Sequence, residues 1–208
     1  IAFATSAGNP LDGEGTLLLS AEGGYRLSAR LAARDPGDAS ANGLLMKSLF
    51  RMGIPVVGKN YFPSNIQGLP TWYEIRASEK GYLARSGKVD IMVAMNAETY
   101  QKDLNDVASG GYLIYDSTWP RARQLSRDDI RIFGVPLARM CNERFTKARE
   151  RVLMKNIAYA GALAALIGMD TGIIAALTKE KYAAKKALLD SNEKAIALGY
   201  DYAKANFS

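Results

Sequence analysis

Between Tyr25 and Gly53 the sequence passes from a strand pattern through a short turn to a helix pattern. The segment "YRLSARLAA" alternates at first and then becomes apolar, which is typical of a strand entering a sheet. The next segment, "RDPGDAS", contains Pro36 and Gly37 and predicts a turn. In "ANGLLMKSLFRMG" the apolar residues then recur at helical spacing until Gly53 ends the helix. A strand, a turn and a helix in this order indicate the first unit of an α/β sheet domain.

The remainder of the chain predicts one α/β domain whose last third is helical. Apolar or alternating stretches predict a helix at 97–108 and further strands at 54–58, 71–78, 89–95, 110–116 and 129–136. From Arg139 onward the pattern is helical. We therefore expect a Rossmann-like domain with a mixed or mostly parallel sheet over residues 25–208. Residues 1–24, rich in glycine and other small residues, are expected to form an arm or loop.

The lack of histidine and the single cysteine exclude several kinds of catalytic centre. Without histidine the chain can form no Ser-His-Asp triad, no Cys-His pair and no His-ligated metal site. Cys141 alone supports neither a disulfide framework nor an iron–sulfur cluster, and we expect a structural thiol. The sequence thus predicts no catalytic residue and no metal site of its own. One cysteine also fits a reducing, cytoplasmic compartment.

The charge balance is basic, with a formal net charge of +6. Such a balance suits phosphate-bearing ligands, nucleic acid or an acidic partner. No dense basic run interleaved with aromatic residues is present, so nucleic acid is disfavoured. The longest uncharged apolar run, 157–169, is too short to span a bilayer and predicts a buried helix.

The turn before the first helix is one candidate binding segment. Gly37, Ser40 and Asn42 lead into a helix, whose free N–H groups and positive end can hold a phosphate. The alternative is an ordinary strand–helix connection with a capping side chain. Asp35 and Asp38 disfavour a phosphate directly beside them.

A second candidate is the stretch "GKNYFPSNIQGLPTWYEIR" at 58–76, interpreted as a long polar loop that leads into a strand. It gathers Lys59, Asn65 and Gln67, and long polar loops in compact domains tend to be functional. Its amide side chains offer donors and acceptors to a nucleotide or a pantetheine arm, and Lys59 can meet a phosphate. The alternative is a surface loop whose asparagines make turns.

Three further features have mainly structural interpretations. Alternation places Trp72, Glu74 and Arg76 on one face of a strand, where an ion pair of the latter two is expected. Asn96 ends an apolar strand, so capping the next helix is its default role and lining a pocket the alternative. The small residues at 160–165 permit close helix packing, on the sheet or against another subunit.

The stretch "ASANGLLMKSLFRMGIPVVGKNYFPSNIQGLPTWYEIRAS" resembles the γ domain of 2-oxoacid:ferredoxin oxidoreductases, as fused at the N-terminus of many α subunits. The later segments "VAMN", "GGYLIYDS", "KNIAYAGALAALIGMD" and "KKALLDSNEKAIALGYDYA" also match, in the same order. The resemblance covers residues 25 to about 207 and is nearest to the ketoglutarate-type subfamily.

This resemblance implies a multi-subunit enzyme that oxidatively decarboxylates a 2-oxoacid to an acyl-coenzyme A. Thiamine diphosphate and iron–sulfur clusters are expected on other domains or chains, which would be this chain's partners, with ferredoxin an indirect one. The γ domain is expected to supply part of the coenzyme A site and to be inactive in isolation. The residues assigned to that site on this basis are Gly37, Ser40, Asn42, Lys59, Asn65, Gln67 and Gly68, and Asn96 is added as the candidate that lines a pocket at the end of its strand.

Other functions remain open at the level of the sequence. A related alternative is the β subunit of an indolepyruvate oxidoreductase, which shares the fold. Another is a scaffold subunit without ligand binding, which the acidic first turn leaves open. A free-standing NAD(P) enzyme is disfavoured because the chain lacks a G-x-G-x-x-G motif.

Overall fold

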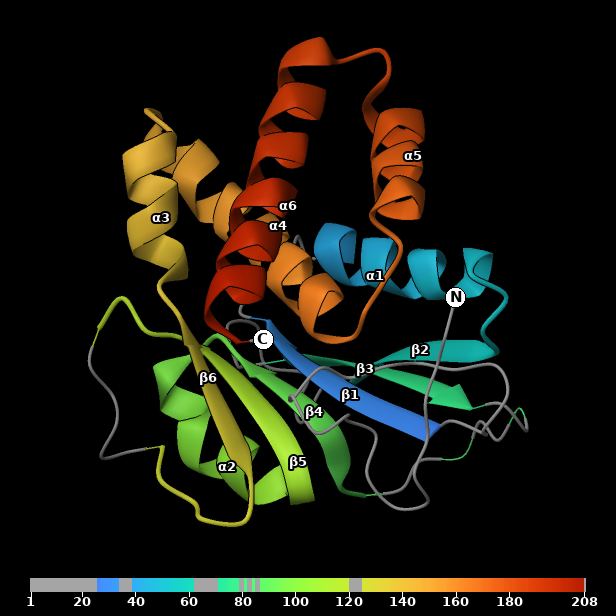
Figure 1. The fold of residues 1–208 in the computed structure, drawn as a ribbon, viewed down its shortest axis with the longest axis vertical. Coiled ribbons are helices and arrows are strands. Elements are labelled where there is room, and N and C mark those ends of the chain that lie inside the picture. The colour runs from blue at the N-terminus through green and yellow to red at the C-terminus, as the bar shows by residue number, and fades with distance from the viewer. Residues whose placement is uncertain are drawn as a thin grey trace.

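The computed structural model describes residues 26–33, 39–61, 71–78, 81, 84, 87–119 and 125–207 (Figure 1). Its centre is a six-stranded sheet in the order β2-β3-β1-β4-β5-β6. Strands β1, β4, β5 and β6 are parallel, whereas β3 is antiparallel to both β1 and β2. The predicted mixed, mostly parallel sheet is therefore confirmed. The strands are β1 (Arg26–Ala33), β2 (Val56–Tyr61), β3 (Thr71–Ser78), β4 (Val89–Ala94), β5 (Val107–Asp116) and β6 (Arg131–Val135).

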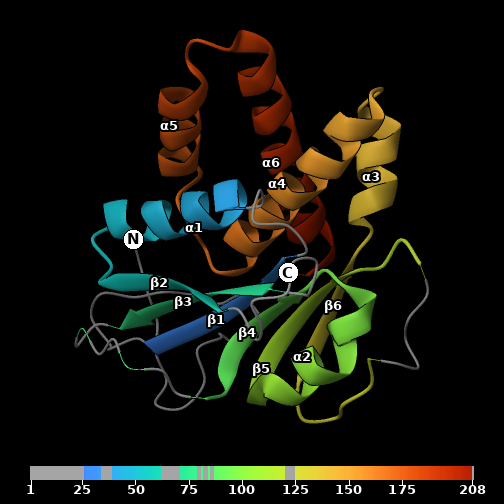
Figure 2. The same ribbon diagram turned by 180° about the vertical axis from the view of Figure 1, so that it is seen from behind.

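Helices cover the sheet unequally. In Figures 1 and 2, α1 and the C-terminal helices lie on one side of the sheet and α2 lies on the other. The predicted helical last third is confirmed, and among the described residues no helix is long and apolar enough to cross a bilayer. The helices are α1 (Ala39–Arg51), the short 3-10 helix η2 (Ala97–Thr99), α2 (Tyr100–Asp106), α3 (Leu137–Arg144), α4 (Ala148–Leu166), α5 (Thr171–Tyr182) and α6 (Lys186–Asn206).

Two hydrophobic clusters fill the two faces of the sheet. Successive residues of β4 point to opposite faces, so Ile91 and Val93 join the cluster under α1 and α4 while Met92 joins the cluster over α2. The same alternation separates Trp72, in the α2 cluster, from Ile75, in the α1 cluster. The predicted faces of β3 are therefore confirmed. An apolar strand such as β4 is stable here because both of its faces are covered.

Helices α4 and α6 pack through glycine. A Cβ atom on Gly161 would meet the backbone carbonyl of Ile196, and one on Gly199 would meet the carbonyl of Ala158. The backbones approach this closely only because neither glycine carries a side chain. Ala162 and Ala164, which are fully buried, belong to the cluster on the sheet. The small-residue run of α4 thus packs within the chain, against the sheet and α6.

Two predicted element boundaries are wrong. The strand β2 continues to Tyr61, so the expected loop from residue 58 begins later than predicted. The predicted Gly-Gly turn before β5 lies within that strand, where Gly110 has a φ of 78° and the register to β4 shifts. Polar and glycine residues suggested loops at both places. Pairing with a neighbouring strand, which local sequence does not show, extended the strands instead.

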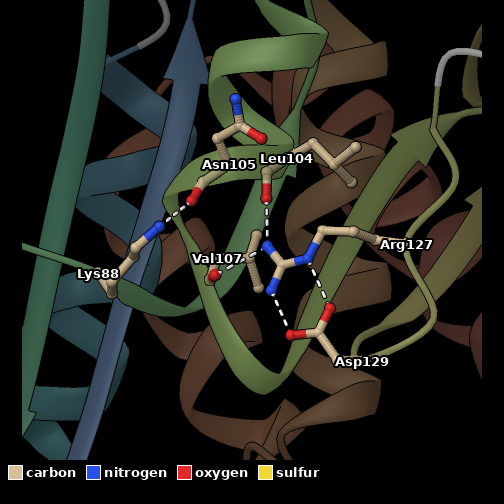
Figure 3. A network of polar contacts seen from close by, with 6 residues as sticks. All are labelled: Lys88, Leu104, Asn105, Val107, Arg127 and Asp129. Atoms are coloured by element: carbon tan, nitrogen blue, oxygen red, sulfur yellow. Dashed lines mark hydrogen bonds and ion pairs between the residues drawn. The ribbon is translucent and has the colours of Figure 1, made fainter.

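Arg127 ties together the amino ends of the parallel strands (Figure 3). Its Nη1 donates to the carbonyls of Leu104, at 2.6 Å, and Val107, at 3.0 Å. Its Nε and Nη2 each donate to Asp129 at 2.7 Å, and this pairing holds the pKa of Asp129 well below its usual range. A cation beside carbonyls at the end of α2 is favourable, because these groups carry the negative end of the helix dipole. The network stabilises the edge opposite the candidate site.

Candidate functional site at the carboxyl edge of the sheet

The connections after β1 and β4 leave the sheet in opposite directions. The two strands are parallel neighbours, with Leu31 opposite Val93. After Ala33 the chain goes to α1 on one face, whereas after Ala94 it goes to η2 and α2 on the other (Figures 1 and 2). Ligands of open α/β sheets bind at such switch points, outside the carboxyl ends of the strands. We therefore take the carboxyl ends of β1 and β4 as the candidate site and call this place the switch point.

Within the second candidate segment, the residues on either side of 62–70 lie at the same edge. Thr71, the first residue of β3, lies opposite Ala33, the last residue of β1. Tyr61, the last residue of β2, lies opposite Trp72. Both described residues that flank 62–70 are therefore at the carboxyl end of β1. The sheet register thus brings together the ends of two segments that the sequence marked separately.

Asn96 lies at the switch point, two residues beyond β4. Its Oδ1 accepts a hydrogen bond from the backbone N–H of Glu98 at 3.1 Å and so caps η2, as predicted. The residue is only 7% exposed, and its buried Nδ2 has no hydrogen-bond partner among the residues that the structure describes. A buried amide donor without an acceptor costs about 1–3 kcal/mol, so a ligand that supplied an acceptor would recover that cost. Capping therefore uses the Oδ1 acceptor of this amide but not its Nδ2 donor.

A buried carboxylate supports the corner after Asn96. Asp103 accepts hydrogen bonds from Trp72 Nε1 at 2.8 Å and from Thr99 Oγ1 at 2.6 Å. It is completely buried, and burial raises its pKa to about 6, although the two hydrogen bonds oppose that shift. The contact links α2 to β3 and fixes the turn that carries Asn96. The sequence analysis did not identify Asp103, because its partner lies on a distant strand.

Asn42 is buried near the start of α1. It is 2% exposed, and its Oδ1 accepts a hydrogen bond from the hydroxyl of Tyr159 on α4. Its carbonyl oxygen is therefore already engaged within the chain, which joins α1 to α4. Ser40 lies in the first turn of α1, because the helix begins at Ala39, two residues before the predicted start at Ala41.

Lys59 lies on β2 rather than in a loop. It is exposed and lies opposite Glu74 of β3, two residues before the end of β2. Its ammonium group is therefore accessible near the carboxyl end of β1, next to the segment 62–70. The expected ion pair of Glu74 with Arg76 stays a prediction. Four other predicted site residues lie outside the described residues, namely Gly37, Asn65, Gln67 and Gly68.

The carboxyl end of β5 carries a polar cluster that the sequence analysis missed. Asp116 Oδ1 accepts hydrogen bonds from Thr118 Oγ1 at 2.6 Å and from the backbone N–H of Ala138, in α3, at 3.3 Å. Its Oδ2 lies 3.9 Å from Lys155 Nζ. Asp116 therefore stabilises the N-terminus of α3, as a negative group at a helix start does. The D-x-T pattern that follows an apolar strand was the available signal.

Cys141 lies close to this cluster and is fully buried. Burial, together with the negative charge of Asp116, raises the pKa of its thiol to about 11. A thiol with such a pKa is protonated at neutral pH and is a poor nucleophile. The burial of Cys141 agrees with its predicted structural role.

The chain thus has an open α/β sheet with a switch point, the place where domains of this class bind ligands. Residues 36–202 match the family described as pyruvate ferredoxin/flavodoxin oxidoreductase, so the chain belongs to this family.

Two curated relatives illustrate how the chain compares within the family. The VorA subunit of ketoisovalerate oxidoreductase from Methanothermobacter thermautotrophicus is 27% identical over 56% of this chain and 23% of its own length. The KorC subunit of 2-oxoglutarate synthase from Methanocaldococcus jannaschii is 27% identical over 56% of this chain and 60% of its own length. In both cases the matched region is less than two thirds of the relative.

Solved structures share the fold. The 2-oxoglutarate:ferredoxin oxidoreductase of Magnetococcus marinus, solved with 2-oxoglutarate, coenzyme A and succinyl-CoA bound, aligns with a TM-score of 0.74 at 22% identity. That match covers 86% of this chain and 31% of the other. The γ subunit of a keto/oxoacid ferredoxin oxidoreductase from Geobacter sulfurreducens aligns with a TM-score of 0.68 at 20% identity, over 86% of this chain and 99% of the other. The expected α/β fold is thereby confirmed.

Proposed function

We propose that this chain is the γ-domain component of a 2-oxoacid:ferredoxin oxidoreductase complex and forms part of its coenzyme A site. Family membership supports the enzyme class. The alignment with nearly the whole length of a γ subunit supports the domain type. The observation that supports the proposal is the switch point, because the described residues next to both candidate segments, Ala33 and Thr71, pair at the carboxyl end of β1, the strand beside β4.

The side chains near the switch point fit the chemistry of coenzyme A. The pantetheine arm contains amide carbonyls, which suit the unused Nδ2 donor of Asn96. The nucleotide end carries phosphates, which suit the exposed ammonium of Lys59 and a chain of net charge +6. Within this proposal, Gly37, Ser40 and Asn42 border the ligand from the first segment. Asn65, Gln67 and Gly68 border it from the second.

The proposed role is to bind and orient coenzyme A, while the oxidative chemistry takes place on other chains. The chain contains no histidine and only one cysteine, so it offers too few of the usual ligands to hold an iron–sulfur cluster. We assign thiamine diphosphate and the clusters to partner chains, with ferredoxin as the electron acceptor and the cytoplasm as the compartment. The isolated chain should accordingly turn over no 2-oxoacid.

The test is Lys59→Ala in the assembled complex. Losing one hydrogen bond to a charged phosphate should weaken coenzyme A binding about 10-fold to 100-fold. Single-turnover decarboxylation on thiamine should stay unchanged, since that step uses no coenzyme A. Lys194→Ala removes an exposed lysine from α6, and this control should alter neither quantity. Unchanged coenzyme A affinity combined with collapsed decarboxylation would instead favour the scaffold role.

A further inference from the structure

Two hydroxyl groups meet over Gly134 at the carboxyl edge of the sheet. A Cβ atom on Gly134 would lie 3.2 Å from both Tyr115 Oη and Ser117 Oγ, and 2.8 Å from the Cβ of Ser117. Because glycine has no side chain, the residues at the end of β5 can lean over β6. The two hydroxyl groups therefore lie on one side of the sheet, close to a common point.

That side of the sheet is the one that α2 covers. Tyr115 packs against the cluster over α2, and its ring meets that of Tyr100 edge-on, with 6.4 Å between the centroids. Asp116 points to the opposite face, where its Oδ1 accepts from the backbone N–H of Ala138 in α3. Tyr115 and Ser117 thus share the α2 side, while the carboxylate between them in sequence faces away.

Asn96 is adjacent to this place. It caps η2, and the next helix begins at Tyr100, whose ring contacts Tyr115. Ala94, the last residue of β4, lies opposite Tyr115 in the parallel ladder. The turn that carries Asn96 and the end of β5 are therefore separated by one strand spacing, about 4.8 Å.

Both hydroxyl groups can bind a ligand. Tyr115 and Ser117 are half-buried, and neither hydroxyl makes a hydrogen bond to another residue that the structure describes. A hydroxyl group both donates and accepts, so the pair can satisfy the N–H and the carbonyl of one amide. The Nδ2 of Asn96 can donate to the carbonyl of a second amide. Such uncharged groups suit a neutral polar chain.

The pantetheine arm of coenzyme A is a chain of this kind. Its two amides are four bonds apart, about 5 Å when the arm is extended. That separation is about one strand spacing. Two successive amides of the arm therefore match the turn at Asn96 and the end of β5.

The order of the strands gives the arm a direction. Lys59, which the proposed function places near the phosphates, lies opposite Glu74 and thus on the face of Trp72 and α2. In the sheet order β5 is four strands from β2, about 19 Å, with β4 just before it. The arm has twelve bonds from phosphate oxygen to sulfur, about 14 Å when extended, and a lysine side chain adds about 6 Å. An arm that starts near Lys59 and passes Asn96 therefore reaches β5 with its thiol end.

We propose that Tyr115 and Ser117 hydrogen-bond the amide next to the thiol of coenzyme A, while Asn96 donates to the other amide of the arm. This inference rests on the proposed function and names the residues that hold the reacting end of the ligand. Both hydroxyl groups position the thiol and take no part in acyl transfer.

The experiment measures binding to the assembled complex by titration calorimetry, with coenzyme A and with its nucleotide half, adenosine bisphosphate. Tyr115→Phe keeps the ring against Tyr100 and loses only the hydroxyl. It should weaken coenzyme A binding about twofold to tenfold and leave binding of the nucleotide half unchanged, and Ser117→Ala should do the same. Tyr182→Phe, at the end of α5, is the matched control and should change neither affinity.

The outcomes separate this inference from the proposed function. Unchanged coenzyme A affinity in both hydroxyl variants overturns the inference, and so does equal weakening of both ligands, because the hydroxyl groups would then act through the fold. If Lys59→Ala weakens coenzyme A binding while the hydroxyl variants change nothing, the proposed function stands alone. If the hydroxyl variants weaken only coenzyme A binding in a complex that forms no acyl-coenzyme A, the site stands and the proposed function falls. A native complex that binds no coenzyme A overturns both.

Discussion

Replacing Asp103 with asparagine should make the chain more stable at neutral pH. Asp103 is completely buried between Trp72 and Thr99, and burial raises its pKa from 3.8 to about 6. An amide can accept the bond from Trp72 Nε1 as the carboxylate does. It can also donate to Thr99, whose hydroxyl lies 3.0 Å from the carbonyl of Asn96 and can donate there. The variant therefore keeps the contacts and loses only the buried charge.

The sign follows from proton linkage. The folded chain holds the proton on Asp103 more tightly than the unfolded chain does. The stability that this protonated side chain contributes is therefore fully present below the pKa that Asp103 has in the unfolded chain. It is lost as the pH rises through the folded pKa of about 6. The difference between a pKa of 3.8 in the unfolded chain and a pKa of about 6 in the folded chain corresponds to roughly 3 kcal/mol of folding free energy, at about 1.4 kcal/mol per pKa unit. Above about pH 7 the native chain has lost this whole contribution to its stability, whereas Asp103→Asn, which does not titrate at this position, has lost none of it.

The assay is urea unfolding of both proteins at several pH values from about 4 to about 8, followed by circular dichroism. The stability of Asp103→Asn minus that of the native chain should grow by about 2–3 kcal/mol across this range. Asp190→Asn, at an exposed position on α6, controls for the loss of one carboxylate and should show no such trend. Parallel stability curves for Asp103→Asn and the native chain would refute the assignment of a raised pKa to Asp103.

Three further predictions test packing, reactivity and the switch point. Gly199→Ala should destabilise the chain by about 1–3 kcal/mol in urea unfolding, because the new Cβ would meet the carbonyl of Ala158. The control Gly43→Ala places a Cβ in open space on α1, so it should stabilise the chain by about 0.5–1 kcal/mol. Cys141 should resist alkylation in the folded chain at pH 8 and react after unfolding; rapid labelling of folded protein would contradict its burial. Asn96→Asp keeps the capping oxygen but removes the Nδ2 donor, so coenzyme A affinity should fall about 10-fold while a thermal melt still shows one cooperative transition. Equal affinities would remove Asn96 from the site.

The sequence alone determined the order of helices and strands and the two faces of β3. The period-2 pattern of β3 correctly separated Trp72 from Tyr73, because successive strand residues always point to opposite faces. Gly53, with a φ of 80°, follows α1 as expected, because glycine adopts that conformation without steric cost. Asn96 was identified as a cap from its place after an apolar strand. These features depend on neighbours within a few residues.

The tertiary structure decided which of these elements meet. No local pattern places β4 beside β1 or puts Thr71 opposite Ala33, yet those pairings create the switch point. Likewise, the contact between Asp103 and Trp72 joins residues that are 31 positions apart. The end of β2 was misjudged for the same reason, since its pairing with β3 kept Lys59 in a strand. Periodicity is set by backbone geometry along the chain, whereas strand order and side-chain partners depend on which distant surfaces bury each other best.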